Sequence, residues 1–343
     1  MPSVLESLNS SLRQAFLDND QVYLLGEDIL DPYGGAFKVS RGLSTQFPDR
    51  VLTTPISEAG FVGVAAGMAL RGLRPVVELM FGDFVTLIAD QMVNHIAKFR
   101  WMYNDQVRLP MVIRTPMGGR RGYGPTHSQT LEKFFLGVPG LQVVAPVALC
   151  QMDASGSPGD LLYQSILHND DPLLFIENKL QYLLPVENQA DLKDFSITSH
   201  WNNTELGFPT YNLSVRGAPP AVLTIAAYGY MAELAKQAVL RLAVEHEIFA
   251  ELVIPTQLSP FDTEHINASA SQTEALLTIE EGTLSLGWGA EVLARVVETP
   301  GSQHIKYKRL AAMEVPVPAS GVLEQQVLPG VEQIIQSALQ MIK

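Results

Sequence analysis

The sequence has almost no cysteine: Cys150 is the only one among its 343 residues. A single thiol excludes an internal disulfide and a metal site built from several cysteines, and it fits a reducing compartment. Basic residues are also scarce, since 23 Lys and Arg stand against 36 Asp and Glu, which gives a net charge of −13. This balance argues against nucleic-acid or anionic-membrane binding, both of which need clustered positive charge.

Long apolar runs are missing as well. No apolar stretch reaches the roughly 18–20 residues that a membrane span needs. The N-terminal segment MPSVLESLNSSLRQAFLDND has helical spacing with several acids and one Arg. It lacks both the apolar core of a signal peptide and the Arg-rich, acid-poor make-up of a transit peptide. We therefore expect a soluble, cytoplasmic protein with no membrane contact.

The common motifs of α/β enzymes are absent too. There is no Gly-x-x-x-x-Gly-Lys-Ser/Thr loop, no Gly-x-Gly-x-x-Gly between a strand and a helix, and no Gly-x-Ser-x-Gly elbow. The seven histidines are scattered and none stands at a metal-ligand spacing from another. Spacing alone therefore predicts no phosphate loop, nucleophile elbow or metal site.

What the sequence does contain is a regular alternation of short apolar runs and helix-period segments. With 47% hydrophobic and 17% charged residues, this is typical of a well-buried α/β protein with mostly parallel sheets. We expect a first domain at 1–185, a polar linker at 186–220 and a second α/β domain at 221–343. The strands expected in the first domain are Val22–Leu25, Val51–Thr53, Val76–Met80, Met111–Arg114, Leu141–Ala145 and Leu173–Glu177, with helices that include Val4–Leu17, Lys38–Phe47, a segment starting at Glu58, and Phe84–Tyr103.

One carboxylate in this pattern is unusual. Glu58 opens a run of small and apolar residues, EAGFVGVAAGMAL, that is typical of a buried helix. Burying a charge without a partner is costly, so Glu58 needs a partner. Ligands of open α/β sheets bind beyond the carboxyl ends of the strands, where Glu27, Glu58, Asp83 with Phe84, and the stretch from Arg114 to His127 are expected.

Several segments, in this order, resemble a known family. They are GEDILDPYGGAFKVSRGL, TPISEAGFVGVAAGMALRGLRPV, DQMVNHIAKFR, IRTPMGG, THSQTLEKFF, PGLQVVAP, DDPLLFIENK, IPTQLSPFD, GWGAEVLA and VPVPASGVLEQQVLP. Together they resemble the β subunit of the thiamine-diphosphate-dependent 2-oxo acid dehydrogenases of the pyruvate and branched-chain types. The resemblance implies a transketolase-like fold, with a pyrimidine-binding domain followed by a transketolase C-terminal-type domain.

The resemblance also implies an activity and partners. The chain would be an oxidoreductase subunit (EC 1.2.4-like) that decarboxylates a 2-oxo acid and transfers the acyl group to a lipoyl group. The family holds the diphosphate through Mg²⁺ on a Gly-Asp-Gly stretch, which this sequence lacks. A separate α subunit is therefore expected to hold Mg²⁺ and share the cofactor, in an assembly of two α and two β chains. A lipoyl acyltransferase core is the expected further partner.

Site residues follow from the resemblance position by position. Glu58 matches the carboxylate that polarises the aminopyrimidine of the cofactor, whereas the plain alternative is an acid that favours the helix dipole. His127 matches the histidine on the substrate side; a structural loop histidine is the alternative. Glu27 resembles a carboxylate near the cofactor, or holds backbone amides of its loop. Phe84 would pack on the aminopyrimidine, or simply in the core.

A potassium ion is a further expectation from the resemblance. Some family members hold K⁺ with backbone carbonyls, and the matching positions are Met111, Ile166, Leu167, Asn169 and Asp171.

Other functions stay open. The acceptor would differ in a carboligase of the acetoin or transketolase type, and an inactive chain would only scaffold an α subunit. The sequence departs from the family at Glu280-Glu281, where many members have His-Glu, and in a longer segment at 148–160. It also has Arg120-Arg121, where small residues are common. These departures bear on substrate choice or on contacts with the acyltransferase core.

Overall fold

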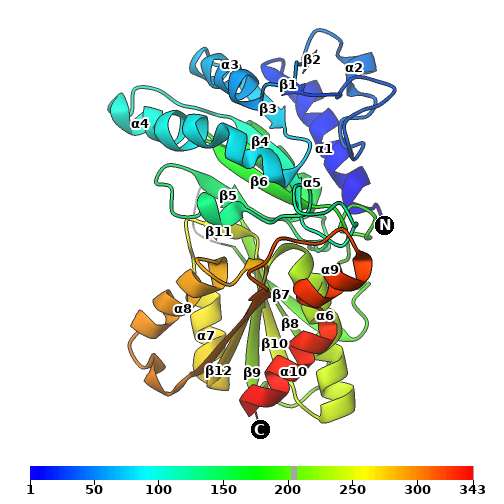
Figure 1. Ribbon diagram of the computed structural model, residues 1–343, viewed down its shortest axis with the longest axis vertical. Coiled ribbons are helices and arrows are strands. Elements are labelled where there is room, and N and C mark those ends of the chain that lie inside the picture. Colours follow the sequence, from blue (N-terminus) through cyan, green and yellow to red (C-terminus); the bar gives the residue numbers. More distant parts are fainter. Residues whose placement is uncertain (202–206, 343) are drawn as a thin grey trace. The chain divides into compact units, whose positions relative to one another are not determined.

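The computed structural model describes residues 1–201 and 207–342. The chain divides into two compact units (Figure 1). Unit 1 comprises 1–118 and 134–186, and unit 2 comprises 119–133 and 187–343. The glycine-rich stretch around His127 thus belongs to unit 2, although it lies inside the first domain in sequence. In the described part of the chain, no helix combines the length and apolar character that crossing a membrane requires.

Unit 1 contains a parallel sheet in the order β5-β6-β4-β3-β1-β2. Its strands are β1 (Val22–Gly26), β2 (Val51–Thr53), β3 (Arg74–Glu78), β4 (Val112–Met117), β5 (Gln142–Val144) and β6 (Leu173–Asn178). Gly26 at the end of β1 pairs with Thr53 of β2 on one side and with Glu78 of β3 on the other. The carboxyl ends of these three strands therefore lie at one edge, which places Glu27 and Glu58 near each other.

The helices of unit 1 differ in part from the expected ones. They are α1 (Val4–Asp18), α2 (Leu43–Gln46), α3 (Glu58–Leu70), α4 (Phe99–Met102) and α5 (Pro158–Leu167), with 3-10 turns at Gly82–Ile88 and Ile96–Lys98 and a π segment at Gln91–His95. A further 3-10 turn, Glu132–Phe134, lies where the chain passes from unit 2 back to unit 1. The helix expected over Lys38–Phe47 is wrong except for its last turn, because Lys38 and Gly42 both have positive φ, at 70° and 84°. The helix expected over Phe84–Tyr103 is a chain of 3-10, π and α turns.

Unit 2 has a mixed sheet in the order β13-β12-β9-β10-β8-β7. Its strands are β7 (Phe195–Trp201), β8 (Pro209–Val215), β9 (Leu223–Ala227), β10 (Ala250–Pro255), β12 (Ala275–Thr283) and β13 (Lys306–Ala312), with the short β11 (Gln257–Ser259). The helices are α6 (Gly229–His246), α7 (Glu264–Thr273), α8 (Trp288–Glu298), α9 (Gly321–Val327) and α10 (Val331–Ile342), with a 3-10 turn at Ser302–His304.

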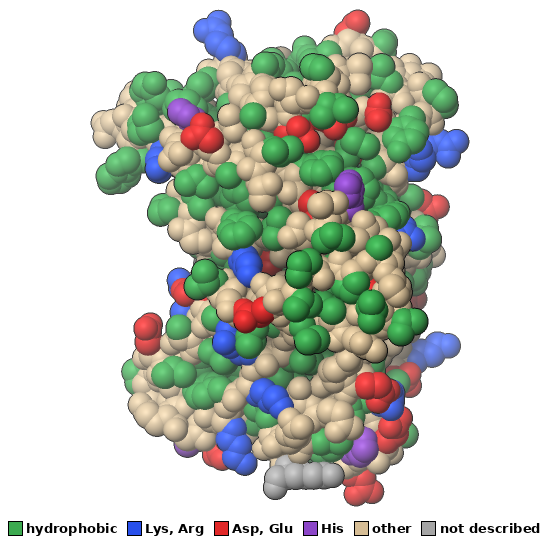
Figure 2. Space-filling view, in the orientation of Figure 1, with side chains coloured by type: hydrophobic (Ala, Val, Ile, Leu, Met, Phe, Trp, Pro, Cys, Tyr) green, Lys and Arg blue, Asp and Glu red, His purple; other side chains and the backbone are tan. Residues whose placement is uncertain are grey.

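The polar linker expected at 186–220 contains two strands, Phe195–Trp201 and Pro209–Val215. β7 and β8 form an antiparallel pair there, and β8 continues antiparallel to β10. β9, β10, β12 and β13 are parallel, as expected for an α/β domain. On the face shown in Figure 2, basic and acidic side chains are interspersed.

Candidate functional site

Glu58 is the first residue of α3 and is 7% exposed. The helix is apolar around its circumference, and Phe61, Val62 and Ala65 behind Glu58 are buried. Among the residues that the structure describes, its carboxylate has neither a hydrogen-bond nor an ion-pair partner. A buried acid at a helix N-terminus is favoured by the helix dipole, but the dipole supplies only about 0.3–1 kcal/mol. The position therefore suits a carboxylate that receives its partner from a ligand.

Glu27, directly after β1, lies within electrostatic range of Glu58. Burial raises the pKa of Glu27, and the nearby Glu58 and Asp28 raise it further, while a backbone hydrogen bond from Ser57 lowers it. Its Oε1 is buried with no hydrogen-bond partner among the described residues. The structure thus brings two of the predicted carboxylates together at one sheet edge.

Phe84 lies in the 3-10 turn after β3 and is half-buried. Its ring contacts Phe81 edge-on, with centroids 5.9 Å apart. Gly82 between them packs on Met117 so closely that an added Cβ would lie 2.3 Å from the Met117 side chain. Phe84 is therefore held in an aromatic cluster, with its side chain half-buried.

His127 belongs to unit 2, in the stretch that leads to the 3-10 turn at Glu132. Its Nδ1 lies 2.9 Å from Oγ1 of Thr126, and its backbone N–H donates to the carbonyl of Gly124 at 3.3 Å. The ring is half-buried. The Thr126 contact orients the ring through its Nδ1.

A buried ion cluster in unit 1 was not predicted from the sequence. Arg114 of β4 donates two hydrogen bonds to Glu177 of β6, at 2.7 and 2.6 Å, and a third to Glu78 of β3. Tyr182 also donates to Glu177. Burial lowers the pKa of Arg114, and the charges of Glu177 and Glu78 more than offset this. Arg114, Glu177 and Glu78 each lie within an apolar run whose sequence predicts an ordinary β-strand.

The cluster reaches the loop after β1. A Cβ added to Gly35, whose φ is +78°, would lie 2.2 Å from Oε1 of Glu78. Only glycine fits this close approach to the carboxylate. The ion cluster therefore fixes the ends of three central strands and also the loop that follows Glu27.

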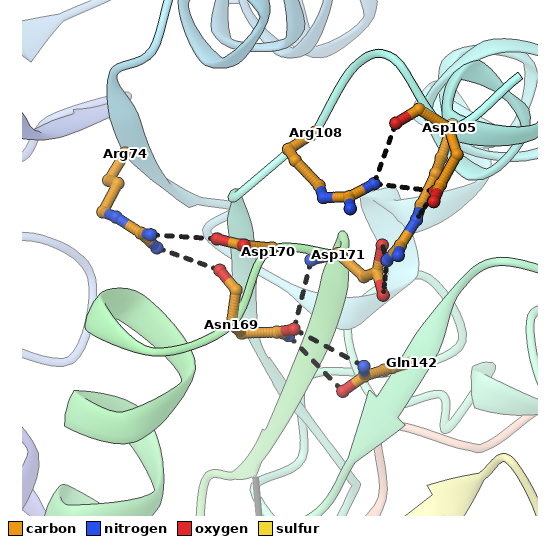
Figure 3. Close-up of polar contacts among 8 residues, drawn as sticks. Arg74, Asp105, Arg108, Gln142, Asn169, Asp170 and Asp171 are labelled. Carbon is orange, nitrogen blue, oxygen red and sulfur yellow. Dashed lines mark hydrogen bonds and ion pairs between the residues drawn. The ribbon is translucent and has the colours of Figure 1, made fainter. Parts of the chain in front are cut away.

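The carbonyl positions predicted for potassium are partly engaged by an arginine (Figure 3). Nη1 of Arg74 donates to the carbonyl of Ile166 at 3.0 Å. It also donates to the carbonyl of Asn169 at 2.9 Å. Its Nη2 pairs with Oδ1 of Asp170 at 3.0 Å. The Met111 carbonyl accepts from the N–H of Leu173 at 3.0 Å, as a normal contact of the sheet.

The two remaining positions predicted for potassium, Leu167 and Asp171, lie at the end of α5 and in the loop before β6. Leu167 is the last residue of α5. The carboxylate of Asp171 accepts two hydrogen bonds from Nη1 of Arg100, at 2.7 and 2.8 Å. The backbone N–H of Asp171 donates to Oδ1 of Asn169. Helix C-termini carry partial negative charge, so a guanidinium at the carbonyl of Ile166 is well placed. A potassium ion bound to the carbonyl oxygens of Ile166 and Asn169 would share these two ligands with Arg74.

A second buried cluster lies in unit 2 and includes Glu132, which belongs to the same stretch as His127. Tyr228 donates to Oε1 of Glu132 at 2.5 Å, and Gly289 N–H donates to Oε1 of Glu280 at 3.1 Å. The Oε2 atoms of both glutamates are buried with no partner among the described residues. Burial and the charge of Glu132 raise the pKa of Glu280 to about 8. Burial also raises the pKa of Glu132, and the two carboxylates interact electrostatically, so their titrations are coupled.

This pair predicts a pH dependence of stability. Because the native pKa of Glu280 is about 8 and its unfolded value 4.5, the native chain retains a proton that the unfolded chain releases between these values. The free energy of unfolding should therefore decrease as pH rises from about 4.5 to 8 and level off above. Glu280→Gln should remove most of this slope in urea unfolding at pH 5, 6, 7 and 8. A variant with the slope of the parent would contradict the assignment.

The comparisons with known proteins agree with this architecture. Residues 2–183 match the transketolase pyrimidine-binding domain, and residues 219–334 match the transketolase C-terminal domain. A solved structure described as a split-gene transketolase, an inactive β4 tetramer, aligns over 100% of both chains with a TM-score of 0.72 at 20% identity, which shows the fold. Fold and domain order therefore define a transketolase-like protein.

The curated relatives are more specific. Pyruvate dehydrogenase E1 component subunit beta-1, mitochondrial, of Oryza sativa subsp. japonica is 36% identical over 98% of this chain and 85% of its own length. The corresponding subunit beta of Bos taurus is 33% identical over 97% and 88%. The chain belongs to the family of these E1 β subunits of the thiamine-diphosphate-dependent 2-oxo acid dehydrogenases. The family implies thiamine diphosphate as cofactor and an α subunit as partner.

The expectation of a cytoplasmic protein is wrong by this comparison. The relatives from rice, Arabidopsis thaliana, Drosophila melanogaster and cattle are all mitochondrial by name. The expectation depended on the composition of the N-terminal helix. That helix is an integral part of unit 1: Gly159 of α5 approaches α1 so closely that an added Cβ would lie 2.3 Å from the Ser7 carbonyl. Its composition therefore reflects packing and carries no information on the compartment.

Proposed function

We propose that this chain, with an α subunit, decarboxylates a 2-oxo acid on thiamine diphosphate and passes the acyl group to a lipoyl group. The observation that carries the proposal is the buried carboxylate of Glu58, which has no partner among the described residues of a chain of this family. The cofactor supplies the carbanion chemistry. Glu58 holds a proton with a ring nitrogen of its pyrimidine, Glu27 supports the charge of that site, and Phe84 packs on the ring.

His127 is proposed to orient the 2-oxo acid and to move a proton on the substrate side. Its hydrogen bond with Thr126 supports this role, because it orients the imidazole ring. The acyltransferase core and its lipoyl domain are the proposed acceptor.

Magnesium is proposed to lie on the α subunit. The sequence has no Gly-Asp-Gly stretch, and within residues 1–201 and 207–342 no group of three His, Cys, Asp or Glu side chains is arranged to hold a metal ion. The exposed face of α3 supports close packing of an α chain. Gly63 and Gly67 have open space where a Cβ would stand, and Val64 beside them is 59% exposed.

At the carbonyls of Ile166 and Asn169 we propose that Arg74 carries the positive charge in place of potassium. The unfolding temperature of the parent should then be the same in KCl and in choline chloride of equal concentration. Arg74→Met should lower the free energy of unfolding by about 1–3 kcal/mol, because buried carbonyls lose their donor. A parent that is stabilised by K⁺ over choline would contradict the proposal.

The function is tested by co-expressing the chain with its α subunit and adding thiamine diphosphate, Mg²⁺, a 2-oxo acid and a lipoyl domain. We expect CO₂ release together with acylation of the lipoyl domain. Release of CO₂ without lipoyl acylation would favour the carboligase alternative. An α–β complex that binds the cofactor and releases no CO₂ would favour the scaffold.

A further inference from the structure

The loop that leads to His127 is exposed, but its two ends meet at a buried base. Residues 119–128 begin and end at buried positions, Gly119 and Ser128. A Cβ added to Gly119 would lie 3.5 Å from the carbonyl oxygen of Ser128. Residues 121–123 and 125–126 between them are exposed. The whole loop belongs to unit 2, and His127 is the residue directly before the point where it closes.

The backbone of this loop needs support from outside the loop. Glycine has the widest conformational freedom of any residue, and three of the first six positions are glycine. The φ angles are +66° at Arg120, +69° at Gly122 and +76° at Gly124. A left-handed conformation is unfavourable for arginine and persists only where the surrounding contacts fix it.

Glu324 of α9 supplies the main support. Its Oε1 accepts from the N–H of Arg120 at 2.6 Å, and its Oε2 accepts from the N–H of Gly122 at 3.2 Å. The residue is 3% exposed, and no Lys, Arg or His in the part of the chain that the structure describes forms an ion pair with it. A buried carboxylate needs partners, and bonds to a charged acceptor are stronger than neutral ones. The N–H groups of the loop are therefore the partners of this charge.

Two further bonds hold the start of the loop. Oε1 of Glu281 accepts from the N–H of Gly119 at 2.8 Å. The guanidinium of Arg120 donates to the carbonyl of Pro329, whereas the side chain of Arg121 is exposed. The first residues of the loop are thus fixed to unit 2 through both backbone and side chain.

The supported part of the loop is connected to His127 at two points. The N–H of His127 donates to the carbonyl of Gly124 at 3.3 Å. At the base, the Cβ position of Gly119 lies 3.1 Å from Oε1 of Glu324 and 3.5 Å from the carbonyl oxygen of Ser128. The carboxylate and the residue that follows His127 therefore pack on the same glycine, so a shift of Glu324 would shift the backbone of His127.

We propose that Glu324 is a positioning residue that fixes the place of the His127 imidazole for the reaction. This inference rests on the proposed function, in which His127 moves a proton on the substrate side. Glu324 acts through the backbone of the loop. A displacement of about 1 Å of a group that takes part in the reaction costs about 100-fold in rate.

The test is a double-mutant cycle with the reconstituted α–β holoenzyme, thiamine diphosphate, Mg²⁺ and an artificial electron acceptor. The substrate is whichever of pyruvate and 4-methyl-2-oxopentanoate the parent decarboxylates faster. Glu324→Gln preserves the size of the side chain but replaces one acceptor oxygen by an NH₂ group, which cannot accept from a backbone N–H. It should lower kcat by about 10- to 100-fold in the parent. In a His127→Ala enzyme the same substitution should lower kcat by no more than about 2-fold, because the group that it positions is gone.

Gly119→Ala perturbs the same base from the side of the loop. Its Cβ would lie 2.6 Å from Cδ1 of Leu328, and the charge of Glu324 is retained. The same pattern of kcat is expected, so the test stands even if Glu324→Gln does not fold. Glu314→Gln is the matched control, because Glu314 is an exposed residue of unit 2 whose Oε1 accepts from the N–H of Ser285 at 3.1 Å. It should leave kcat unchanged.

Folded Glu324→Gln and Gly119→Ala enzymes with the kcat of the parent would overturn the inference. An equal loss in the parent and in the His127→Ala enzyme would indicate a general structural role and would also overturn it. A His127→Ala enzyme as fast as the parent would defeat the inference together with the role of His127, while decarboxylation by the parent would still support the proposed function. If a folded, cofactor-loaded parent decarboxylates neither 2-oxo acid, the proposed function itself fails and the inference fails with it.

Discussion

Glu58→Gln is expected to slow decarboxylation by about 10²- to 10⁴-fold while the chain stays folded. Glutamine preserves the size of the side chain but cannot share a proton with a ring nitrogen in the way a carboxylic acid does. Glu58 has no partner among the described residues, so the substitution breaks no contact within this chain. The measurement is CO₂ release by the reconstituted α–β enzyme at saturating thiamine diphosphate, with far-UV circular dichroism as the check on folding.

Asp28→Asn is the matched control for this variant. Asp28 is an exposed acid next to Glu27, and its φ of +53° is a conformation that asparagine tolerates. It removes one negative charge near the same sheet edge, so it reports the general effect of local charge. We expect a change of less than a few-fold. If Glu58→Gln were as fast as the parent, Glu58 would have no part in activation.

Much of unit 1 could be predicted from the sequence because its signals are local. An apolar run followed by a turn predicts each parallel strand, and β2 was predicted with its observed bounds, Val51–Thr53. The same rule predicts which side chains follow the strand ends, and the structure confirms that Glu27 and Glu58 lie close together. A single acidic residue at the end of an apolar run is easy to detect in the sequence, because few structural roles require a charge at such a position.

The polar strand pair of unit 2 was missed for a different reason. β7 has the sequence FSITSHW, in which Ser and Thr alternate with apolar residues at the edge of the sheet. One face of an edge strand is solvated, so its composition resembles that of a loop. A period of two was present, but short polar strands do not stand out from a segment rich in Pro, Asn and Gly.

The loop around Arg121 could not be placed from sequence at all. Its anchors, Glu281 and Glu324, are 162 and 204 residues distant from the N–H groups they accept. No periodicity links a glycine-rich loop to carboxylates so far along the chain. Only the tertiary structure shows that residues 119–133 belong to unit 2, and that Arg120 and Arg121 have different environments.

The ion cluster at Arg114 leads to the largest expected effect on stability. Arg114→Met should lower the free energy of unfolding by about 3–5 kcal/mol, because it leaves Glu78 and Glu177 buried without a counter-charge. The side chains of all three residues are at most 5% exposed. Urea unfolding at pH 7 measures the change. Arg100→Met is the matched control, because its ion pair with Asp171 is partly exposed and should contribute about 0–1 kcal/mol.

A second substitution separates lost charge from lost packing. Adding Glu78→Gln to Arg114→Met should recover part of the stability, because a neutral amide in place of Glu78 no longer needs the guanidinium. If the loss arose from packing alone, the double variant would be less stable than the single one. Since Glu78 also contacts the loop at Gly35, next to Glu27, recovery of stability without recovery of decarboxylation would show that the cluster positions this loop. A loss from Arg114→Met no larger than that of Arg100→Met would refute the role of the cluster in stability.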